Sequence, residues 1–342
     1  MRDGALEVDE FALPDPLEHQ VVIDTVACGI CGSDLHCLRH ADQLVETSRE
    51  GGMDVFVFDT SADVVMGHEI AGRVARPAAD GSGPAEGTPV AVMPGLTVPG
   101  QPVRAIGYSN NYPGGYAEQF VADAIGCVPI PEHVDPTRAA LTEPLAVGLH
   151  AVNAGGDELP GGAVVLGCGP VGLTVVAWLA ARGVAPIVAA DFSPGRRALA
   201  STMGAHVATD PASLPAVEAW REAGGTDSTP PVIYECVGVP GMIDQAITMA
   251  PRNTTIVVVG LCMESDTFRP TMAINRHVSL HFVLGWGRRE FTQSLDAIAS
   301  GTIDVEPLIT GQVDLAGVPA AFEELASPRE HAKILVIPGG AA

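Results

Sequence analysis

The sequence is poor in basic residues and in aromatic residues. Lys and Arg together number 18 against 41 for Asp and Glu, which gives a formal net charge of −23. A protein of this sign repels nucleic acid phosphates and anionic membranes, so we expect neither as a partner. Aromatic residues make up only 5% and hydrophobic residues 47% of the chain. This balance is typical of an α/β protein rich in alanine, valine and glycine.

Cysteines that could pair in a regular framework are also missing. The seven cysteines are an odd number scattered over 342 residues, which argues against disulfides and favours a reducing compartment. The first residues are charged and contain no apolar segment of a secretory signal, so a cytoplasmic protein is expected. Cys28 and Cys31 form a CxxC, but no second CxxC completes a four-thiolate zinc site.

No long apolar run is free of interruption. Residues 163–181 are almost without charge and are about long enough to span a bilayer. Glycines and a proline near the start of this run divide it into a short strand and a helix. We therefore do not expect a membrane segment.

The length of the chain favours two domains of roughly 150 residues. The first 145 or so residues contain short strands, for example at 21–26, 70–74 and 90–93, between glycines and prolines. From residue 163 apolar runs alternate with helical segments, which predicts βαβ units and a doubly wound parallel sheet. The six strands expected there lie at 164–166, 187–190, near 207, 232–236, 255–259 and 278–284. The pattern of residues 40–63 does not fix their structure, although an excursion near the active site is one interpretation.

A glycine-rich motif follows the first of these parallel strands. It consists of Gly167, Gly169, Pro170, Val171 and Gly172, and an apolar helical segment comes next. A GxGxxG placed between a buried strand and a helix is what binding of a dinucleotide pyrophosphate requires. The glycines permit a tight turn, close approach of the phosphates and close packing of helix on strand, and the helix N-terminus faces the negative charge.

Asp191 lies 19 residues after Gly172 and directly follows the next expected strand. A carboxylate at this spacing accepts hydrogen bonds from the adenosine ribose and repels a 2′-phosphate, which favours NAD over NADP. Arg196 and Arg197 lie nearby and keep NADP open as an alternative. A second interpretation has no nucleotide, with a plain glycine turn and an aspartate that caps the next helix.

Four residues far apart in the sequence are candidate metal ligands. A catalytic zinc takes three protein ligands and leaves one position open. Cys31, His68 and one of Glu69 or Glu143 would supply a thiolate, an imidazole and a carboxylate. Each of them alone is more often structural, since a lone cysteine usually acts as a small buried hydrophobe. The combination is what points to a metal site.

The chain resembles the zinc-dependent medium-chain dehydrogenases in the order of its motifs. These motifs are CGICGSDLH, GHE, EPLAVGLHA and the GxGxxG with its aspartate. The similarity is to their sorbitol and polyol dehydrogenase branch and covers nearly the whole chain, including SGTID, PLIT and HAKILV near the end. It implies a Rossmann domain with a doubly wound parallel sheet at 148–289. It also implies a GroES-like, β-rich catalytic domain at 1–147 that is completed by about 290–342.

The resemblance also assigns roles to individual residues. Cys31 and His68 match the zinc ligands of the family. Glu69 and Glu143 match two carboxylates that bind the metal directly or through water in different members, and the sequence does not choose between them. Asp34 matches an acid that orients the imidazole of a zinc-bound histidine.

Ser33 and His36 match a proton relay in the same family. One departure concerns the metal content, because many relatives carry four closely spaced cysteines after the segment that corresponds to 90–92. The stretch that follows here contains none, so one catalytic zinc and no structural zinc is expected. That lobe commonly helps subunits associate, so its loss leaves the oligomeric state open; a homodimer or a homotetramer is expected.

The function implied is hydride transfer between NAD and a secondary alcohol, diol or polyol, with a ketone or aldehyde as the product. One alternative is a zinc-free reductase that uses NADPH on quinones or enones, and another is a non-catalytic NAD-binding protein. The substrate, a small alcohol or carbonyl compound, would meet a pocket whose shape selects it. Aromatic candidates for its lining, each also a candidate for plain core, are Phe56, Phe58, Tyr108, Tyr112 and Trp286.

Overall fold

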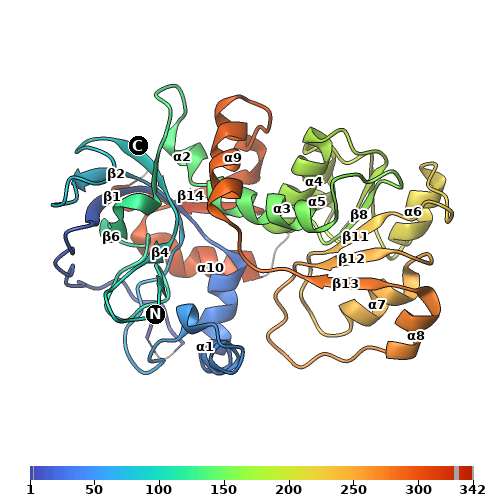
Figure 1. Cartoon of the computed structure of the whole chain (residues 1–342), viewed down its shortest axis with the longest axis horizontal. Coiled ribbons are helices and arrows are strands. Elements are labelled where there is room, and N and C mark those ends of the chain that lie inside the picture. Colours follow the sequence, from blue (N-terminus) through green and yellow to red (C-terminus); the bar gives the residue numbers. More distant parts are fainter. Residues whose placement is uncertain (3, 327–330, 341–342) are drawn as a thin grey trace.

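The computed structural model describes residues 1–2, 4–326 and 331–340. Within these ranges most strands belong to two large sheets, which lie at opposite ends of the molecule in Figure 1. The first sheet combines N-terminal segments, in blue to teal, with red segments from the C-terminal part of the chain. The expected completion of the first domain by about 290–342 includes residues 327–330 and 341–342, which lie outside the described residues.

The first sheet has the strand order β14-β15-β1-β2-β3-β7, and β6 also pairs with β1. Its long strand β1 is buried along most of its length and pairs antiparallel with β2, β6 and β15. Strands β4 and β5 form a separate two-stranded sheet, and Leu96 of β4 packs into the core of the first sheet. The strands are β1 Gln20–Gly29, β2 Glu69–Arg76, β3 Pro89–Val92, β4 Gly95–Leu96, β5 Arg104–Ala105, β6 Gln119–Asp123, β7 Cys127–Pro129, β14 Ile309–Val313 and β15 Lys333–Val336.

Helices surround the first sheet. The longest, α1, continues well beyond the CGICGSDLH motif, with a kink at His40, where φ is −136° and ψ is 36°. Residues 40–50 therefore extend α1, which settles the first part of the stretch whose structure the sequence left open. These elements are α1 Gly32–Glu50, α2 Pro136–Ala139, α10 Val318–Ala326, and the 3-10 turns η1 Asp54–Phe56, η2 Ala124–Gly126, η3 Glu306–Leu308 and η4 Leu315–Gly317.

The second sheet is fully parallel, with the order β10-β9-β8-β11-β12-β13, which confirms the predicted doubly wound sheet. Strands β8, β9 and β11 are buried at every position because helices cover both faces, and continuous apolar runs suit such strands. In the part of the chain described here, no helix is both long and apolar enough to cross a membrane. The strands are β8 Ala163–Leu166, β9 Ile187–Ala190, β10 Val207–Thr209, β11 Val232–Glu235, β12 Thr255–Val258 and β13 Ser279–Phe282, and the helices are α4 Pro170–Ala181, α5 Pro194–Thr202, α6 Ala216–Glu222, α7 Met242–Met249 and α8 Pro270–Arg276.

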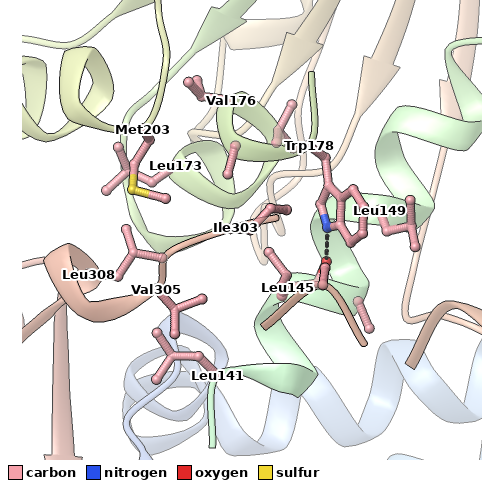
Figure 2. Packing of buried hydrophobic residues seen from close by; sticks show 14 of the residues in the cluster. Leu141, Leu145, Leu149, Leu173, Val176, Trp178, Met203, Ile303, Val305 and Leu308 are labelled. Atoms are coloured by element: carbon pink, nitrogen blue, oxygen red, sulfur yellow. Dashed lines mark hydrogen bonds between the residues drawn. The ribbon is translucent and has the colours of Figure 1, made fainter. Parts of the chain in front are cut away.

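Helices α3 (Thr142–Ala154) and α9 (Arg288–Ala299) lie between the two sheets and pack against each other (Figure 1). Figure 2 shows the apolar core at this junction, where Trp178 Nε1 of α4 donates a hydrogen bond of 2.8 Å to Leu145 O of α3. Close packing requires Gly148, because a Cβ there would lie 2.5 Å from Thr174 Oγ1. The domain boundary expected between residues 147 and 148 falls inside α3, which packs against β2 of the first sheet and against α4, which covers the second sheet.

Candidate active site

The pairing of β1 with β2 brings distant residues together. Gly29 at the end of β1 is the register partner of Glu69 at the start of β2. Cys31 follows β1 by two residues and His68 precedes β2 by one, so both side chains reach the same edge of the sheet. The sheet register therefore creates a site that the linear sequence only suggests.

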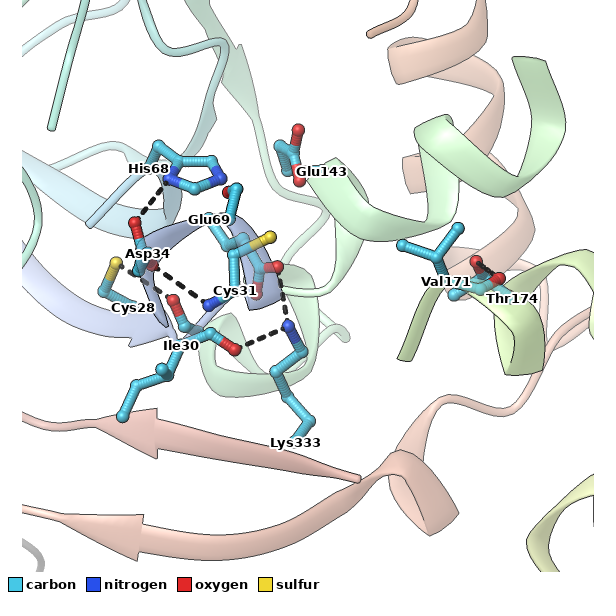
Figure 3. A network of polar contacts seen from close by, with 12 residues as sticks. Cys28, Ile30, Cys31, Asp34, His68, Glu69, Glu143, Val171, Thr174 and Lys333 are labelled. Atoms are coloured by element: carbon cyan, nitrogen blue, oxygen red, sulfur yellow. Dashed lines mark hydrogen bonds and ion pairs between the residues drawn. The ribbon is translucent and has the colours of Figure 1, made fainter. Parts of the chain in front are cut away.

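Cys31, His68 and Glu69 each offer one ligand atom, and these atoms all lie within 4.8 Å of one another. His68 and Glu69 are buried and Cys31 is half-buried. The buried Glu69 Oε2 has no hydrogen-bond partner, so one acceptor in the group is unsatisfied. A thiolate, an imidazole and a carboxylate with such an oxygen fit a zinc ion. Figure 3 shows the three side chains converging.

Asp34 holds the imidazole of His68 in place. Its Oδ1 lies 3.3 Å from His68 Nδ1, while its Oδ2 accepts hydrogen bonds from Cys31 N at 3.0 Å and from Tyr116 OH at 2.6 Å. Burial alone would raise the pKa of Asp34, but the charge of His68 and these hydrogen bonds lower it. With Nδ1 facing this carboxylate, Nε2 is the nitrogen left for a metal, as in carboxylate–histidine–zinc arrangements.

Lys333 is a residue of this site that the sequence analysis missed. It lies on β15, the neighbour of β1, and is 1% exposed. Its Nζ donates to Glu69 Oε1 at 2.6 Å and to Ile30 O at 2.9 Å. Burial lowers the pKa of Lys333, but the charge of Glu69 outweighs burial and the pKa is raised. The signal in the sequence was one lysine inside the apolar run AKILVI, where a buried charge requires a partner.

Glu143, the other candidate carboxylate, lies in the first turn of α3. Its Oε1 accepts a hydrogen bond of 2.8 Å from Trp286 Nε1, and burial raises the pKa of its carboxyl group. Within the described ranges, Glu143 is not part of the group formed by Cys31, His68 and Glu69. Figure 3 places it beside the imidazole of His68.

Ser33 and His36, the two residues of the expected proton relay, both line a large cleft that also contains Cys31, His68 and Glu69. Ser33 Oγ accepts a hydrogen bond of 2.9 Å from Tyr108 OH, and this hydroxyl also lies 3.4 Å from Asp34 Oδ1. Burial lowers the pKa of His36. As far as the chain is described, Ser33 and His36 do not bond to each other. The partner of Ser33 is instead Tyr108, a residue that the sequence suggested only as pocket lining.

The glycine-rich motif adopts the expected turn between β8 and α4. Gly167 has a φ of 89°, and a Cβ on Gly172 would lie 1.9 Å from Gly167 O, so both positions need glycine. Gly169 is the N-cap of α4 and Pro170 its first residue. Val171 lines the cleft with them. The backbone N–H groups at this helix start are suited to a phosphate.

Asp191 lies against the glycine-rich turn. Its Oδ2 accepts a hydrogen bond from Cys168 N and its Oδ1 one from Ser193 N, both at 2.8 Å. Arg196, in the first turn of α5, lines the same cleft, and its buried Nε has no hydrogen-bond partner. The structure thus brings together the nucleotide-binding candidates that the sequence identified.

One cleft of about 1480 Å³ contains both the metal group and the glycine-rich turn. Phe56, Tyr108 and Trp286 line it as expected. The expectation is wrong for the other two aromatic candidates, since Phe58 lines a separate pocket and Tyr112 packs beside the core of the first sheet. The residues beside them in the sequence gave no means of telling a lining position from a core position.

Fold and site together define a protein with a nucleotide-type turn on one parallel sheet and a group of candidate metal ligands at the edge of a second sheet. Residues 17–132 match the family model of the alcohol dehydrogenase GroES-like domain, and residues 170–300 match that of the zinc-binding dehydrogenases. The chain belongs to the zinc-type medium-chain dehydrogenases, in their polyol dehydrogenase-like branch. The predicted combination of a GroES-like domain and a Rossmann sheet is confirmed.

Similar proteins span almost the whole chain. Sorbitol dehydrogenase of Bos taurus is 28% identical over 332 residues, which cover 94% of this chain and 90% of the relative. (R,R)-butanediol dehydrogenase of Bacillus subtilis is 27% identical, and the match covers 97% and 96% of the two chains. A crystal structure of 2R,3R-butanediol dehydrogenase from the same organism has a TM-score of 0.82 at 26% identity and covers 98% of this chain and 97% of its own.

Proposed function

We propose that this dehydrogenase transfers a hydride between a secondary alcohol, diol or polyol and NAD, and that it uses one catalytic zinc. The observation that carries the proposal is the convergence of Cys31, His68 and Glu69 within 4.8 Å, in the cleft that also holds the glycine-rich turn. Because the metal group and the nucleotide site share one cleft, a substrate held by its oxygen at the metal group can present its carbon to the nucleotide. The similar sorbitol and butanediol dehydrogenases agree with this class of substrate.

The chain's own residues hold and orient the reacting groups. Zinc supplies a Lewis acid for the substrate oxygen, and NAD accepts the hydride. Cys31, His68 and Glu69 bind the metal, and Asp34 fixes the ring of His68. Glu143 would bind the metal through water or in exchange with Glu69, because one of its oxygens already accepts a hydrogen bond from Trp286. A single zinc per chain follows from the lack of cysteines between residues 94 and 118.

Ser33 receives the proton of the alcohol at its Oγ. The hydrogen bond from Tyr108 occupies one lone pair of this oxygen, so the second lone pair accepts the substrate proton while the proton of Ser33 itself moves on. Because Ser33 does not bond to His36 among the described residues, water in the cleft would carry this proton to His36, half-buried on the same helix, which passes it to solvent. Replacing Ser33 with Ala should slow hydride transfer about 100-fold while zinc stays bound.

The coenzyme proposed is NAD rather than NADP. Asp191 stands at the turn where the adenosine ribose binds in such sheets, and its charge disfavours a 2′-phosphate. The unpartnered Nε of Arg196 is the feature that favours NADP instead. The ratio of kcat/KM for NAD to kcat/KM for NADP distinguishes the two.

A panel of alcohols, diols and sugars, assayed with NAD by NADH absorbance on protein of measured zinc content, tests the proposal. We expect oxidation of secondary alcohols or diols and about one zinc per chain. Protein that holds zinc but oxidises no member of the panel would contradict the proposal. Reduction of enones with NADPH by zinc-free protein would favour the alternative reductase.

We also propose a cytoplasmic homo-oligomer, either a dimer or a tetramer. Strand β13 is the edge strand of the second sheet, and its Phe282 is 66% exposed. An exposed apolar edge strand is a surface on which a second copy can continue the sheet. Light scattering after size-exclusion chromatography should give a dimer or larger, and a monomer would contradict this proposal.

A further inference from the structure

The stretch 44–56 has a polar side and an apolar side. Along the end of α1 and through η1, its cleft-facing residues are Leu44, Thr47, Ser48, Gly51, Met53, Val55 and Phe56. The polar residues Asp42, Glu46 and Arg49 of the same helix instead line a separate pocket of about 650 Å³. We call residues 44–56 the α1–η1 wall. Its mostly apolar side faces the site of the reaction.

The C-terminal end of the α1–η1 wall, at Phe56, lies close to the candidate metal ligands. The ring of Phe56 meets that of Tyr108 edge-on, with centroids 5.3 Å apart and planes at 85°. The ring of Tyr108 in turn lies 5.4 Å from that of His68. A substrate whose oxygen lies at the metal group can therefore extend its substituent along Phe56, Val55 and Met53.

The opposite side of the cleft is also apolar. It includes Leu261, Leu284 and Trp286 from the loops after β12 and β13. Apolar side chains on both sides of the cleft are exposed: Met53 of the wall is 41% exposed, and Leu261 and Leu284 of the opposite side are 39% and 55% exposed. Gln43 Nε2 donates to Met263 O and so ties α1 to the loop after β12. Exposed apolar side chains gathered from both sides mark a surface that an apolar ligand covers.

Charged groups near the metal ligands are already bonded within the protein. Glu143 bonds to Trp286, and Lys333 is committed to Glu69. At the rim of the cleft, Asp123 accepts from Thr97, and the guanidinium of Arg288 from α9 donates to Ile125 O. Besides Ser33 and His36, the polar side chains of α1 that line the cleft are Thr47 and Ser48, and the rest of the wall there is apolar.

We propose that the cleft selects alcohols or diols that carry an alkyl or aryl substituent of several carbons, with the α1–η1 wall as the specificity element. The inference rests on the dehydrogenase function proposed above and names its substrate class. Most hydroxyls of a polyol placed against this wall would lose hydrogen bonds to water without replacement, because only Thr47 and Ser48 offer hydroxyl partners there. Each added methylene would instead gain by burial about fourfold in kcat/KM.

Two alcohol series test the proposal. The first is the set of 2-alkanols from 2-propanol to 2-octanol, and the second compares 1,2-hexanediol with sorbitol, which has the same carbon chain. We expect kcat/KM to rise about fourfold per methylene, and to be at least about tenfold higher for the diol than for sorbitol. A flat series, or equal or better use of sorbitol, overturns the substrate class while the dehydrogenase function stands. Failure to oxidise any of these compounds overturns the proposed function itself.

Variants on both sides of the cleft test the wall. Met53→Gln and Leu284→Gln change exposed residues, so the fold should tolerate them. Each should lower the ratio of kcat/KM for 2-octanol over 2-propanol by about fivefold to tenfold. Each should also weaken binding of 2-octanol to nucleotide-free protein in calorimetry. Val8→Gln is the control, since Val8 is 61% exposed and lies outside the cleft. An unchanged ratio in Met53→Gln overturns the role of the wall, and an unchanged ratio in Leu284→Gln overturns the role of the opposite side.

Discussion

The nucleotide region and the metal region of the cleft are built in different ways. The nucleotide region consists of one short segment, 167–172, with Asp191 added by the next strand, and it presents mainly backbone groups. The metal region joins side chains from the turn between β1 and α1, from the start of β2, from α3 and from β15, which are far apart in the chain. The first region depends on local geometry, whereas the second depends on the register of a sheet. The two should therefore respond differently to substitution.

The two regions also differ in how they hold charge. In the metal region Asp34, His68, Glu69 and Lys333 are all buried, and each ion pair there must remain complete to be tolerated. In the nucleotide region the carboxylate of Asp191 is satisfied by two backbone N–H groups. Loss of a partner should thus cost stability in the metal region and affinity in the nucleotide region.

The largest effect is expected from Cys31→Ala. Loss of the thiolate should release zinc and lower turnover on the order of a thousandfold, because the metal supplies several kcal/mol to the transition state. Binding of NADH, followed by fluorescence, should stay close to that of the unaltered protein. Cys127→Ala, at a buried cysteine outside the cleft, is the matched control. Full turnover by Cys31→Ala would refute the metal site.

The next effect concerns the buried pair of Lys333 and Glu69. Lys333→Met leaves Glu69 as an unpaired buried charge and should lower the free energy of unfolding by about 3–5 kcal/mol. Urea unfolding of the zinc-free protein measures this loss. The double variant with Glu69→Gln should recover much of it, since no charge is then left alone. If Lys333→Met costs less than about 1 kcal/mol, the pair is not what stabilises this edge of the sheet.

Asp191→Gly tests the nucleotide region. Removal of the carboxylate should raise the KM for NAD about tenfold, the effect of one lost hydrogen bond to a charged group. It should also relax the preference toward NADP. The free energy of unfolding should change less than in Lys333→Met. Steady-state kinetics with both coenzymes measures the ratio, and Asp227→Asn, an exposed residue of the same sheet region, is the control. An unchanged coenzyme ratio would remove Asp191 from the ribose site.

The smallest effect lies at the junction of the two regions. Glu290 of α9 accepts hydrogen bonds from Gly287 N at 2.7 Å and Asn153 Nδ2 at 2.8 Å, and pairs with His150 Nδ1 at 3.0 Å. Burial would raise the pKa of Glu290, but these contacts outweigh burial and lower it. Its stabilisation is therefore present above the unfolded-state pKa of about 4.3 and is lost as pH falls through the lower folded value.

Glu290→Gln should thus lower the free energy of unfolding by about 1 kcal/mol at neutral pH, because the amide keeps the bond to Gly287 N but loses the negative charge at the helix N-terminus. The difference from the unaltered protein should narrow in urea titrations below about pH 4. A difference that persists in acid would mean that the charge of Glu290 is not the cause.

The sequence predicted the two regions to different depths. The turn at 167–172, the strands beside it and Asp191 were all found, because glycine spacing and apolar runs are local signals. Cys31, His68 and Glu69 were candidates, but nothing in their spacing chose Glu69 over Glu143. Tyr108 and Tyr116 gave no local signal of their bonds to Ser33 and Asp34.

Composition, glycine placement and the run of parallel strands determined the class of fold and the nucleotide turn, because those properties act over a few neighbouring residues. Only the tertiary structure decided the rest. It placed Lys333 on Glu69, extended α1 past His40, and aimed the apolar side of residues 44–56 into the cleft. These outcomes depend on which strands pair and which faces are buried, and such choices are made by the whole chain at once.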